Sequence, residues 1–278
     1  MHSFLSDEPM KGDAPYQWVN FMRPKLRRFP SESLASLKWK SKVGYGIDGV
    51  VLKAKLGDGS LVAVKIFNSP ERPEPINGCP RYWAFKRECQ NSALLDMIKT
   101  SLKQAALNDR HIYLHPCPRT YKEALRNLKA FSAEAALEPT PPPNFKPADF
   151  DARPNDCLGW TEFSAQEVRT LLQRLKADAP DMEPDRSSYF AIVYSFVPEG
   201  TLDDAVIQAQ YDFFYLVGFT FAQFKEDNWR GSGILVDFSD LTSPLTTWWD
   251  RLVYGKWIKR VMRTGLARWT VETPNRPP

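Results

Sequence analysis

Apolar and polar positions change their period several times along the chain, and each period predicts a different element. Apolar residues alternate with polar ones over 50–56, and an apolar run covers 61–67 after Gly57-Asp58-Gly59, so two strands joined by a hairpin turn are predicted. Over 82–102 apolar residues recur at helical spacing, which predicts a long helix. The run 189–197 is almost wholly apolar and predicts a central strand.

Weaker patterns of the same two kinds predict further helices and strands. The helices are expected over 121–136, 165–177 and 202–222, and the strands over 157–163 and 233–238. No internal repeat is visible, so a repeat architecture is not expected.

Composition divides the chain into segments. The first residues mix proline, aspartate and serine with a basic cluster and show no periodicity, which is typical of a loosely ordered arm. A stretch beyond the long helix contains three consecutive prolines and polar loop sequence, which predicts an insertion. The predicted segments are a flexible N-terminal arm over 1–35, a first unit over 36–103, the insertion over 104–187 with a strand near 157–163, a second unit over 188–265 and a tail over 266–278.

The composition is that of a globular protein that folds by itself. Of 278 residues, 43% are hydrophobic and 13% aromatic, which is enough to bury a core. The formal charge of +4 is small and neither sign forms a long run, so no direct contact with nucleic acid is implied. The aromatic run 211–224 is shorter than the ~20 apolar residues that span a bilayer, and polar residues interrupt it, so no membrane partner is expected.

The cysteines indicate the compartment. Cys79, Cys89, Cys117 and Cys157 stand far apart and form no CxxC pair, and no cleavable signal begins the chain. We therefore expect reduced thiols in an intracellular protein of the nucleus or cytoplasm.

A glycine-rich motif precedes the first predicted strand. Gly44, Gly46, Gly49 and Val51 match G-x-G-x-x-G-x-V at every fixed place. Glycines let backbone amides approach phosphates closely, but a dinucleotide-binding fold would need a helix to begin here, and a strand continues instead. Taken alone, the motif is most simply an ordinary glycine-rich hairpin turn, and a hairpin that covers a nucleotide is the functional alternative.

A lysine and a glutamate follow at informative places. The second strand contains Val62-Ala63-Val64-Lys65, and the ammonium of Lys65 can reach nucleotide phosphates beneath the glycine hairpin. Glu88 lies 23 positions later on the predicted long helix, where its carboxylate can orient that ammonium. Taken singly, each residue is better explained as an exposed charge. Together they predict an ion pair.

An amide and a carboxylate flank the last predicted strand. Asn228 precedes it and Asp237 ends it, and both side chains are hard oxygen ligands suited to Mg²⁺. An asparagine in a turn and an aspartate that caps the next element are the alternatives. We expect the two side chains to converge on one metal-binding spot.

These features, in this order, resemble the protein kinase superfamily. The resemblance implies an α+β, two-lobed fold, with a five-stranded antiparallel sheet and one helix in the N-lobe and a truncated helical C-lobe. It implies ATP and Mg²⁺ as cofactors, with Lys65 as the phosphate-binding lysine and Glu88 as its partner, and with Val51 and Ala63 beside the nucleotide. By the same resemblance Tyr194–Gly200 is the hinge that holds adenine.

The chain departs from the family where catalysis is performed. The place of the usual catalytic aspartate holds Gln223, which cannot accept a proton, although Lys225 falls on the catalytic-loop lysine. Glu226 and Asp227 are stand-in bases, and we take Asp227 as the candidate. The resemblance and this departure together predict a pseudokinase that binds nucleotide and acts as a binding or scaffold protein. The alternative is an active atypical ATP-dependent kinase.

A narrower resemblance is to the fungal kinase-like domains of the Sim-four kinetochore complex, of the Fta-two type. It covers the glycine motif, the strand around Lys65, the sequence Cys157-Leu158-Gly159-Trp160 and the end from Asn228 to Ser239. The resemblance implies protein partners in a kinetochore complex. A structural subunit that has kept only the fold is therefore a third possible function.

Overall fold

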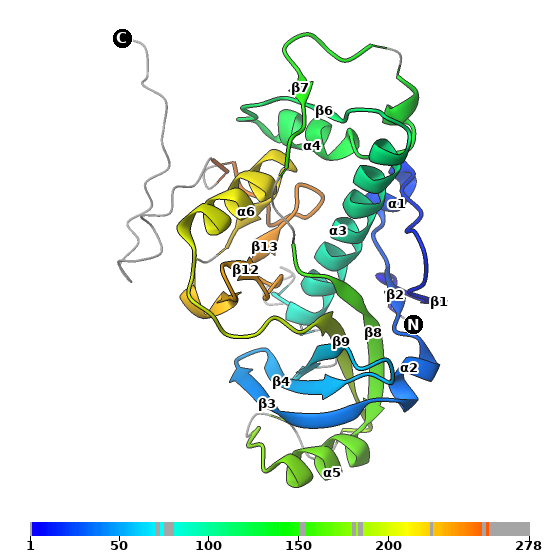
Figure 1. The fold of residues 1–278 in the computed structure, drawn as a ribbon, viewed down its shortest axis with the longest axis vertical. Coiled ribbons are helices and arrows are strands. Elements are labelled where there is room, and N and C mark those ends of the chain that lie inside the picture. The colour runs from blue at the N-terminus through cyan, green and yellow to red at the C-terminus, as the bar shows by residue number, and fades with distance from the viewer. Residues whose placement is uncertain are drawn as a thin grey trace. The chain divides into compact units, whose positions relative to one another are not determined.

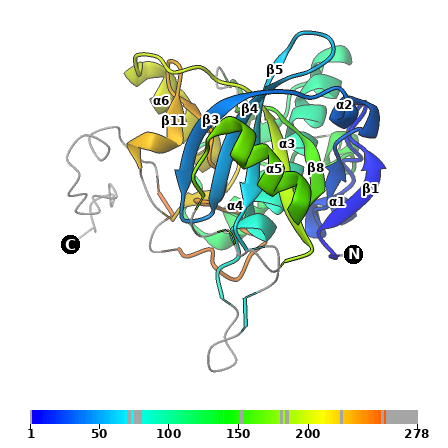
Figure 2. The same cartoon turned by 90° about the horizontal axis from the view of Figure 1, so that it is seen from below.

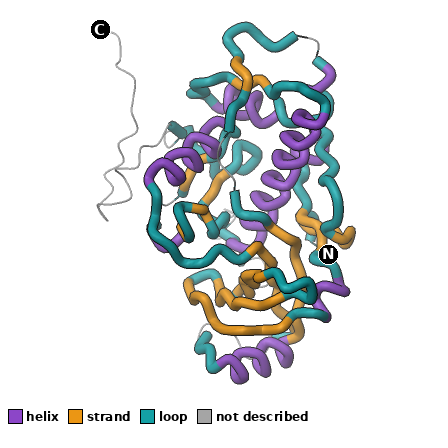
Figure 3. Tube along the Cα trace, in the orientation of Figure 1, coloured by secondary structure: helices purple, strands orange, loops and turns teal. Residues whose placement is uncertain are grey.

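The computed structural model of the chain describes residues 2–69, 73–74, 81–138, 140–150, 154–179, 182, 186–222, 225–251 and 254–255. The chain forms two compact units. Unit 1 consists of Met1–Gly12, Lys25–Ala93 and Asp156–Phe196, and unit 2 of Asp13–Pro24, Leu94–Asn155 and Val197–Pro278. Figure 1 labels the elements, and Figure 3 shows where helices, strands and loops fall along the chain.

Unit 1 is built on a mixed sheet. Within the described residues it has seven strands in the order β1-β2-β8-β9-β5-β4-β3. The five strands from β8 to β3 pair antiparallel, whereas β1 with β2 and β2 with β8 pair in parallel. The strands are β1 (Leu5–Pro9), β2 (Leu26–Arg28), β3 (Lys38–Gly46), β4 (Gly49–Lys55), β5 (Leu61–Phe67), β8 (Cys157–Ser164) and β9 (Ser188–Ser195).

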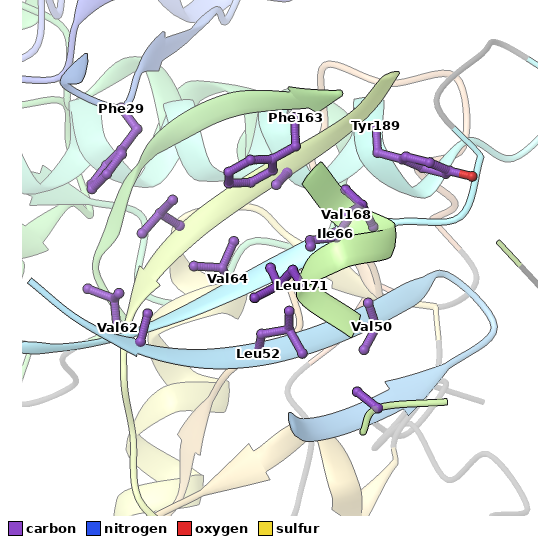
Figure 4. Packing of buried hydrophobic residues seen from close by; sticks show 14 of the residues in the cluster. Phe29, Val50, Leu52, Val62, Val64, Ile66, Phe163, Val168, Leu171 and Tyr189 are labelled. Carbon is purple, nitrogen blue, oxygen red and sulfur yellow. The ribbon is translucent and has the colours of Figure 1, made fainter. Parts of the chain in front are cut away.

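One face of this sheet packs against α5 (Ala165–Leu175), which Figure 2 shows lying across the strands. The helix begins at a capping box, in which the Ser164 hydroxyl accepts a hydrogen bond from the Glu167 amide and the Glu167 carboxylate accepts one from the Ser164 amide. Val168 and Leu171, three residues apart on the helix, reach the sheet. They meet the fully buried alternate residues of the strands (Figure 4), which are Val50, Leu52, Val62, Val64 and Ile66.

The other face carries the intervening residues and packs against the beginning of α3 (Ala84–Leu107). Here Phe85 of the helix stacks on Phe190 of β9, with ring centroids 4.8 Å apart, and lies 5.1 Å from the ring of Phe67 on β5. Phe85 and Phe67 are almost fully buried, whereas Phe190 is partly exposed. Because successive strand residues point to opposite faces, Lys65 lies on this face too, between Val64 and Ile66 of the opposite one.

Helices make up most of the regular secondary structure of unit 2, which also contains three small two-stranded pairings among its described residues. The pairings are β10 (Thr220–Phe221) with β13 (Leu241–Thr242), β11 (Trp229–Arg230) with β12 (Ile234–Leu235), and β6 (Tyr113–Leu114) with β7 (Lys146–Pro147). The helices and turns are α1 (Trp18–Met22), the rest of α3, α4 (Tyr121–Lys129), η1 (Ala135–Leu137), α6 (Asp204–Leu216) and η2 (Glu226–Asn228).

Several sequence-based expectations need correction. The arm over 1–35 instead contains β1, α1, β2 and α2 (Ser31–Ala35), and its strands extend the sheet of unit 1. In the described part of the chain the sheet is therefore seven-stranded and mixed rather than five-stranded and antiparallel. The expected insertion over 104–187 supplies β8, which is an internal strand of the same sheet. The predicted tail over 266–278 lies outside the described residues.

The broad class is as expected, because helices combine with one large mixed sheet. The helix expected over 202–222 is shorter than predicted and ends at Leu216, and the one expected over 121–136 ends at Lys129. No helix among the described residues is long and apolar enough to cross a membrane.

Candidate functional site

The expected ion pair between Lys65 and Glu88 is present in unit 1. The Lys65 Nζ lies 2.8 Å from Glu88 Oε2, and the Glu88 side chain has no solvent exposure at all. The Lys65 side chain is 9% exposed, so only a small part of it remains in contact with solvent. The ammonium also lies 5.3 Å from the centre of the Phe67 ring on the same strand face.

Two more side chains join this group; the sequence had given no role to Ser92 and had indicated Tyr194 only as part of the expected hinge. The Tyr194 hydroxyl, on β9, donates to Glu88 Oε1 at 2.8 Å, and the Ser92 hydroxyl, one turn after Glu88 on α3, lies 3.2 Å from the Tyr194 oxygen. Burial raises the pKa of Tyr194 well above its ordinary value, and the charge of Glu88 raises it further. Tyr194 therefore keeps its proton and remains a donor.

Tyr194, which the sequence placed in the expected hinge, contacts Glu88. Tyr194 is the first residue of the segment expected to hold adenine, yet its side chain is 3% exposed and points to Glu88. The next two amides are also engaged, since Ser195 N donates to Asp156 O and Phe196 N to Leu61 O. The side chain of Tyr194 therefore belongs to the group around Glu88.

The glycine motif forms the hairpin between β3 and β4. Gly46 pairs with Gly49, and Ile47 and Asp48 form the turn. The turn is fastened by Asn68, just beyond β5, whose amide donates to Asp48 O at 3.0 Å and whose side-chain Nδ2 donates to Ile47 O at 3.2 Å. The hairpin is consequently held at its tip.

The three glycines differ in what the fold requires of them. A Cβ on Gly49 would lie 2.0 Å from the backbone oxygen of Ile66, so the approach of β4 to β5 excludes any side chain there. A Cβ on Gly44 or Gly46 would meet no other atom within 4 Å. The packing of the hairpin thus explains Gly49 and leaves Gly44 and Gly46 bordering open space.

Val51 and Ala63 share the strand face of Lys65. Val51 is paired with Lys65 across β4 and β5, and Ala63 precedes Lys65 by two positions. Both are only partly buried, whereas Val50, Leu52, Val62 and Val64 on the opposite face are fully buried. A partly uncovered apolar patch therefore adjoins the buried ammonium.

In unit 2 the structure joins Asn228 to a carboxylate that the sequence had not indicated. Asn228 Nδ2 donates to Asp240 Oδ2 at 2.7 Å, and both residues are 8% exposed. Lys225 Nζ lies 3.8 Å from the same oxygen. Asp240 stands three positions after the predicted metal ligand Asp237, but an aspartate near a strand end gives no sign in the sequence that it will be buried.

Asp237 follows the short hairpin of β11 and β12. The amide of Val236, the residue before it, donates to Asn228 O at 2.9 Å, which ties the backbone of the two predicted ligands together. The carboxylate Oδ1 accepts hydrogen bonds from the amide and hydroxyl of Ser239, at 2.9 and 2.6 Å. Among the residues that the structure describes, no three His, Cys, Asp or Glu side chains gather closely enough to hold a metal ion by themselves.

Asp227, the candidate base, is exposed on η2. It lines a hollow of about 470 Å³ in unit 2 together with Glu199, Gly200, Leu202, Glu226, Trp229 and Arg230. Arg230 pairs there with Glu199 at 2.5 Å. Gln223, at the place of the usual catalytic aspartate, lies outside the described residues.

The comparisons with known proteins leave the family open. No protein-family model matches the chain, and a search of curated proteins gives no significant match. Any statement of function therefore has to rest on the groups described above.

Proposed function

We propose that the protein binds ATP through unit 1 and acts as a pseudokinase, that is, as a nucleotide-responsive binding or scaffold protein. The observation that carries the proposal is the buried pair of Lys65 and Glu88, 2.8 Å apart. A lysine paired with a helix glutamate is the arrangement by which protein kinases hold the α and β phosphates of ATP. Removing two charges from water is costly, so such a pair is rarely kept for stability alone.

The glycine hairpin supports the same function. Gly44 and Gly46 border open space, so a ligand can approach the backbone there without meeting a side chain. Backbone amides that are free of side chains are suited to phosphate oxygens. The partly uncovered Val51 and Ala63 would contact the apolar faces of the base or ribose, because they adjoin Lys65 on one strand face.

The proposal includes Mg²⁺ in unit 2. Asn228 and Asp237 would hold it, and Asp240 joins them as a third oxygen donor, because it already contacts Asn228. An amide oxygen and carboxylates are the donor set that Mg²⁺ prefers, so the residues fit this ion. When bound, the ion would supply positive charge to this group of oxygen donors in unit 2.

The test is nucleotide binding by calorimetry, with ATP alone and with ATP and Mg²⁺. We expect binding in the wild type and its loss in Lys65→Met, since the methionine keeps most of the length of the side chain and removes the ammonium. The matched control is Lys55→Met, an equal change of charge at an exposed residue of β4. Equal affinities in wild type and Lys65→Met would refute the role of Lys65.

An active atypical kinase is the second candidate, because the exposed carboxylate of Asp227 lines a hollow. In that case Asp227 accepts the proton of the attacking hydroxyl. Phosphotransfer that is present in the wild type, survives in Glu226→Gln and collapses in Asp227→Asn would favour this candidate over the pseudokinase. Absence of any ATP effect, with or without Mg²⁺, would leave the structural subunit with protein partners, as in a kinetochore complex.

A further inference from the structure

The carboxylate of Glu88 has two anchors on two neighbouring strands. Oε2 accepts from Lys65 on β5, and Oε1 accepts from Tyr194 on β9, both at 2.8 Å. The strands are adjacent in the sheet, where Lys65 pairs with Ile192 and Ala63 with Tyr194. Each oxygen of the carboxylate therefore has its own donor, and the two donors tie the beginning of α3 to two different strands of the sheet.

The hydrogen bonds run in one direction. The phenol of Tyr194 has a single proton, which it donates to Glu88, so the 3.2 Å contact with Ser92 requires the serine hydroxyl to donate to the tyrosine oxygen. Ser92 lies four positions after Glu88 and therefore on the same face of α3. The helix thus contacts the Tyr194 hydroxyl twice: Glu88 accepts a hydrogen bond from it, and Ser92, one turn later, donates one to it.

This second anchor changes what happens when Lys65 turns to a phosphate. A hydrogen bond from a phenol to a buried carboxylate is charge-assisted and strengthened by the low polarity around it. It remains when the ammonium moves to a more highly charged partner. In a site with only the lysine as anchor, by contrast, the helix is free to move away whenever the ion pair opens.

We propose that Tyr194 is a positioning residue that fixes Glu88 independently of Lys65, so that the helix stays docked on the sheet with or without nucleotide. The site in unit 1 is then permanently assembled rather than switched on by movement of α3. The expected effect on nucleotide affinity rests on the proposed function, whereas the docking of the helix on the sheet is independent of it.

The first arm of the test measures amide hydrogen exchange over 85–93 of α3 in the full chain without nucleotide. Tyr194→Phe removes only the hydroxyl, and we expect faster exchange there, by about tenfold, the usual consequence of losing one hydrogen bond to a charged group. The matched control is Tyr189→Phe, a buried tyrosine of the same strand whose side chain lies on the opposite face, in the cluster against α5. Ser92→Ala is a milder second variant, expected to act in the same direction by about threefold.

The second arm asks whether the tyrosine acts through Glu88. Tyr194→Phe should weaken ATP binding by about tenfold in the wild type, and it should have no further effect in a Glu88→Leu background, where residue 88 can no longer accept the hydrogen bond of the phenol. A tyrosine that only fills space would show the same loss in both backgrounds. Unchanged exchange over 85–93 in both Tyr194→Phe and Ser92→Ala, or equal losses of affinity in the two backgrounds, would overturn the proposal. If the wild type binds no ATP, faster exchange still supports the second anchor, and only the proposed function fails.

Discussion

Stability measurements can test whether the charges of Lys65 and Glu88 act as one buried unit. With Glu88 fully buried and Lys65 9% exposed, removing one partner leaves an uncompensated charge in the interior. Lys65→Met and Glu88→Leu should each lower the free energy of unfolding by about 3 to 5 kcal/mol. The double variant Lys65→Met/Glu88→Leu should lose far less than the sum of the two, because apolar groups of similar size replace a pair whose desolvation was costly.

Tyr194 makes the expected values more specific. In Lys65→Met, Glu88 keeps the hydrogen bond from Tyr194, so the loss should lie near the lower end of that range. In the double variant the Tyr194 hydroxyl has lost its carboxylate acceptor, which costs about 1 to 3 kcal/mol. Adding Tyr194→Phe should recover much of that residual loss. The triple variant is then expected to be more stable than either single variant.

The assay is urea unfolding followed by far-ultraviolet circular dichroism, with all variants measured at the same pH and ionic strength. The slope of the free energy against urea should stay constant across the set, since the surface exposed on unfolding hardly changes. If the double variant loses as much free energy of unfolding as the two single variants together, the two charges do not interact in the folded protein.

The glycines and cysteines give further predictions. Gly49→Ala should destabilise the protein by at least about 2 kcal/mol in thermal unfolding, because its Cβ would lie 2.0 Å from Ile66 O, whereas Gly44→Ala should change stability by less than about 0.5 kcal/mol. If ATP is bound at the hairpin, Gly44→Ala should nevertheless weaken its affinity in calorimetry. A thiol titration should modify the exposed Cys117 rapidly and leave Cys89 unmodified until the protein unfolds, since burial raises the pKa of the Cys89 thiol and keeps it protonated; rapid modification of both would contradict this burial.

The sequence predicted the part of the site that follows from local pattern. Lys65 lies in a clear apolar run and Glu88 on a clear helix, so their pairing follows once the helix is placed on the face of the sheet that carries Lys65. Tyr194 could not be found in this way, because an aromatic residue inside an apolar run looks like any other core residue. Its role depends on the strand register that brings β9 beside β5.

The sequence did not predict β1 and β2, the strands whose place in the sheet depends on a strand far along the chain. Leu5 and Leu26 are almost fully buried, yet the strands around them are short and contain proline, acidic or basic residues, so no alternation marks them. β8 offers β2 a parallel partner far along the chain, and β1 in turn pairs in parallel with β2. Asp240 was missed for a related reason, since its burial arises from the contact with Asn228 rather than from its neighbours in sequence.

The two edges of the sheet in unit 1 also bear on how the protein avoids self-association. An unpaired strand edge is a template on which another chain can add a strand, and proteins block such edges with charge or proline. The outer strand β3 presents exposed lysines at 38, 40 and 42, and the outer strand β1 contains Asp7 and Glu8 and ends at Pro9. Removal of residues 1–28 would take away β1 and β2 together and uncover the edge of β8, which has no comparable run of charges. Such a shortened protein is expected to aggregate even though Lys65, Glu88 and the glycine hairpin are all still present.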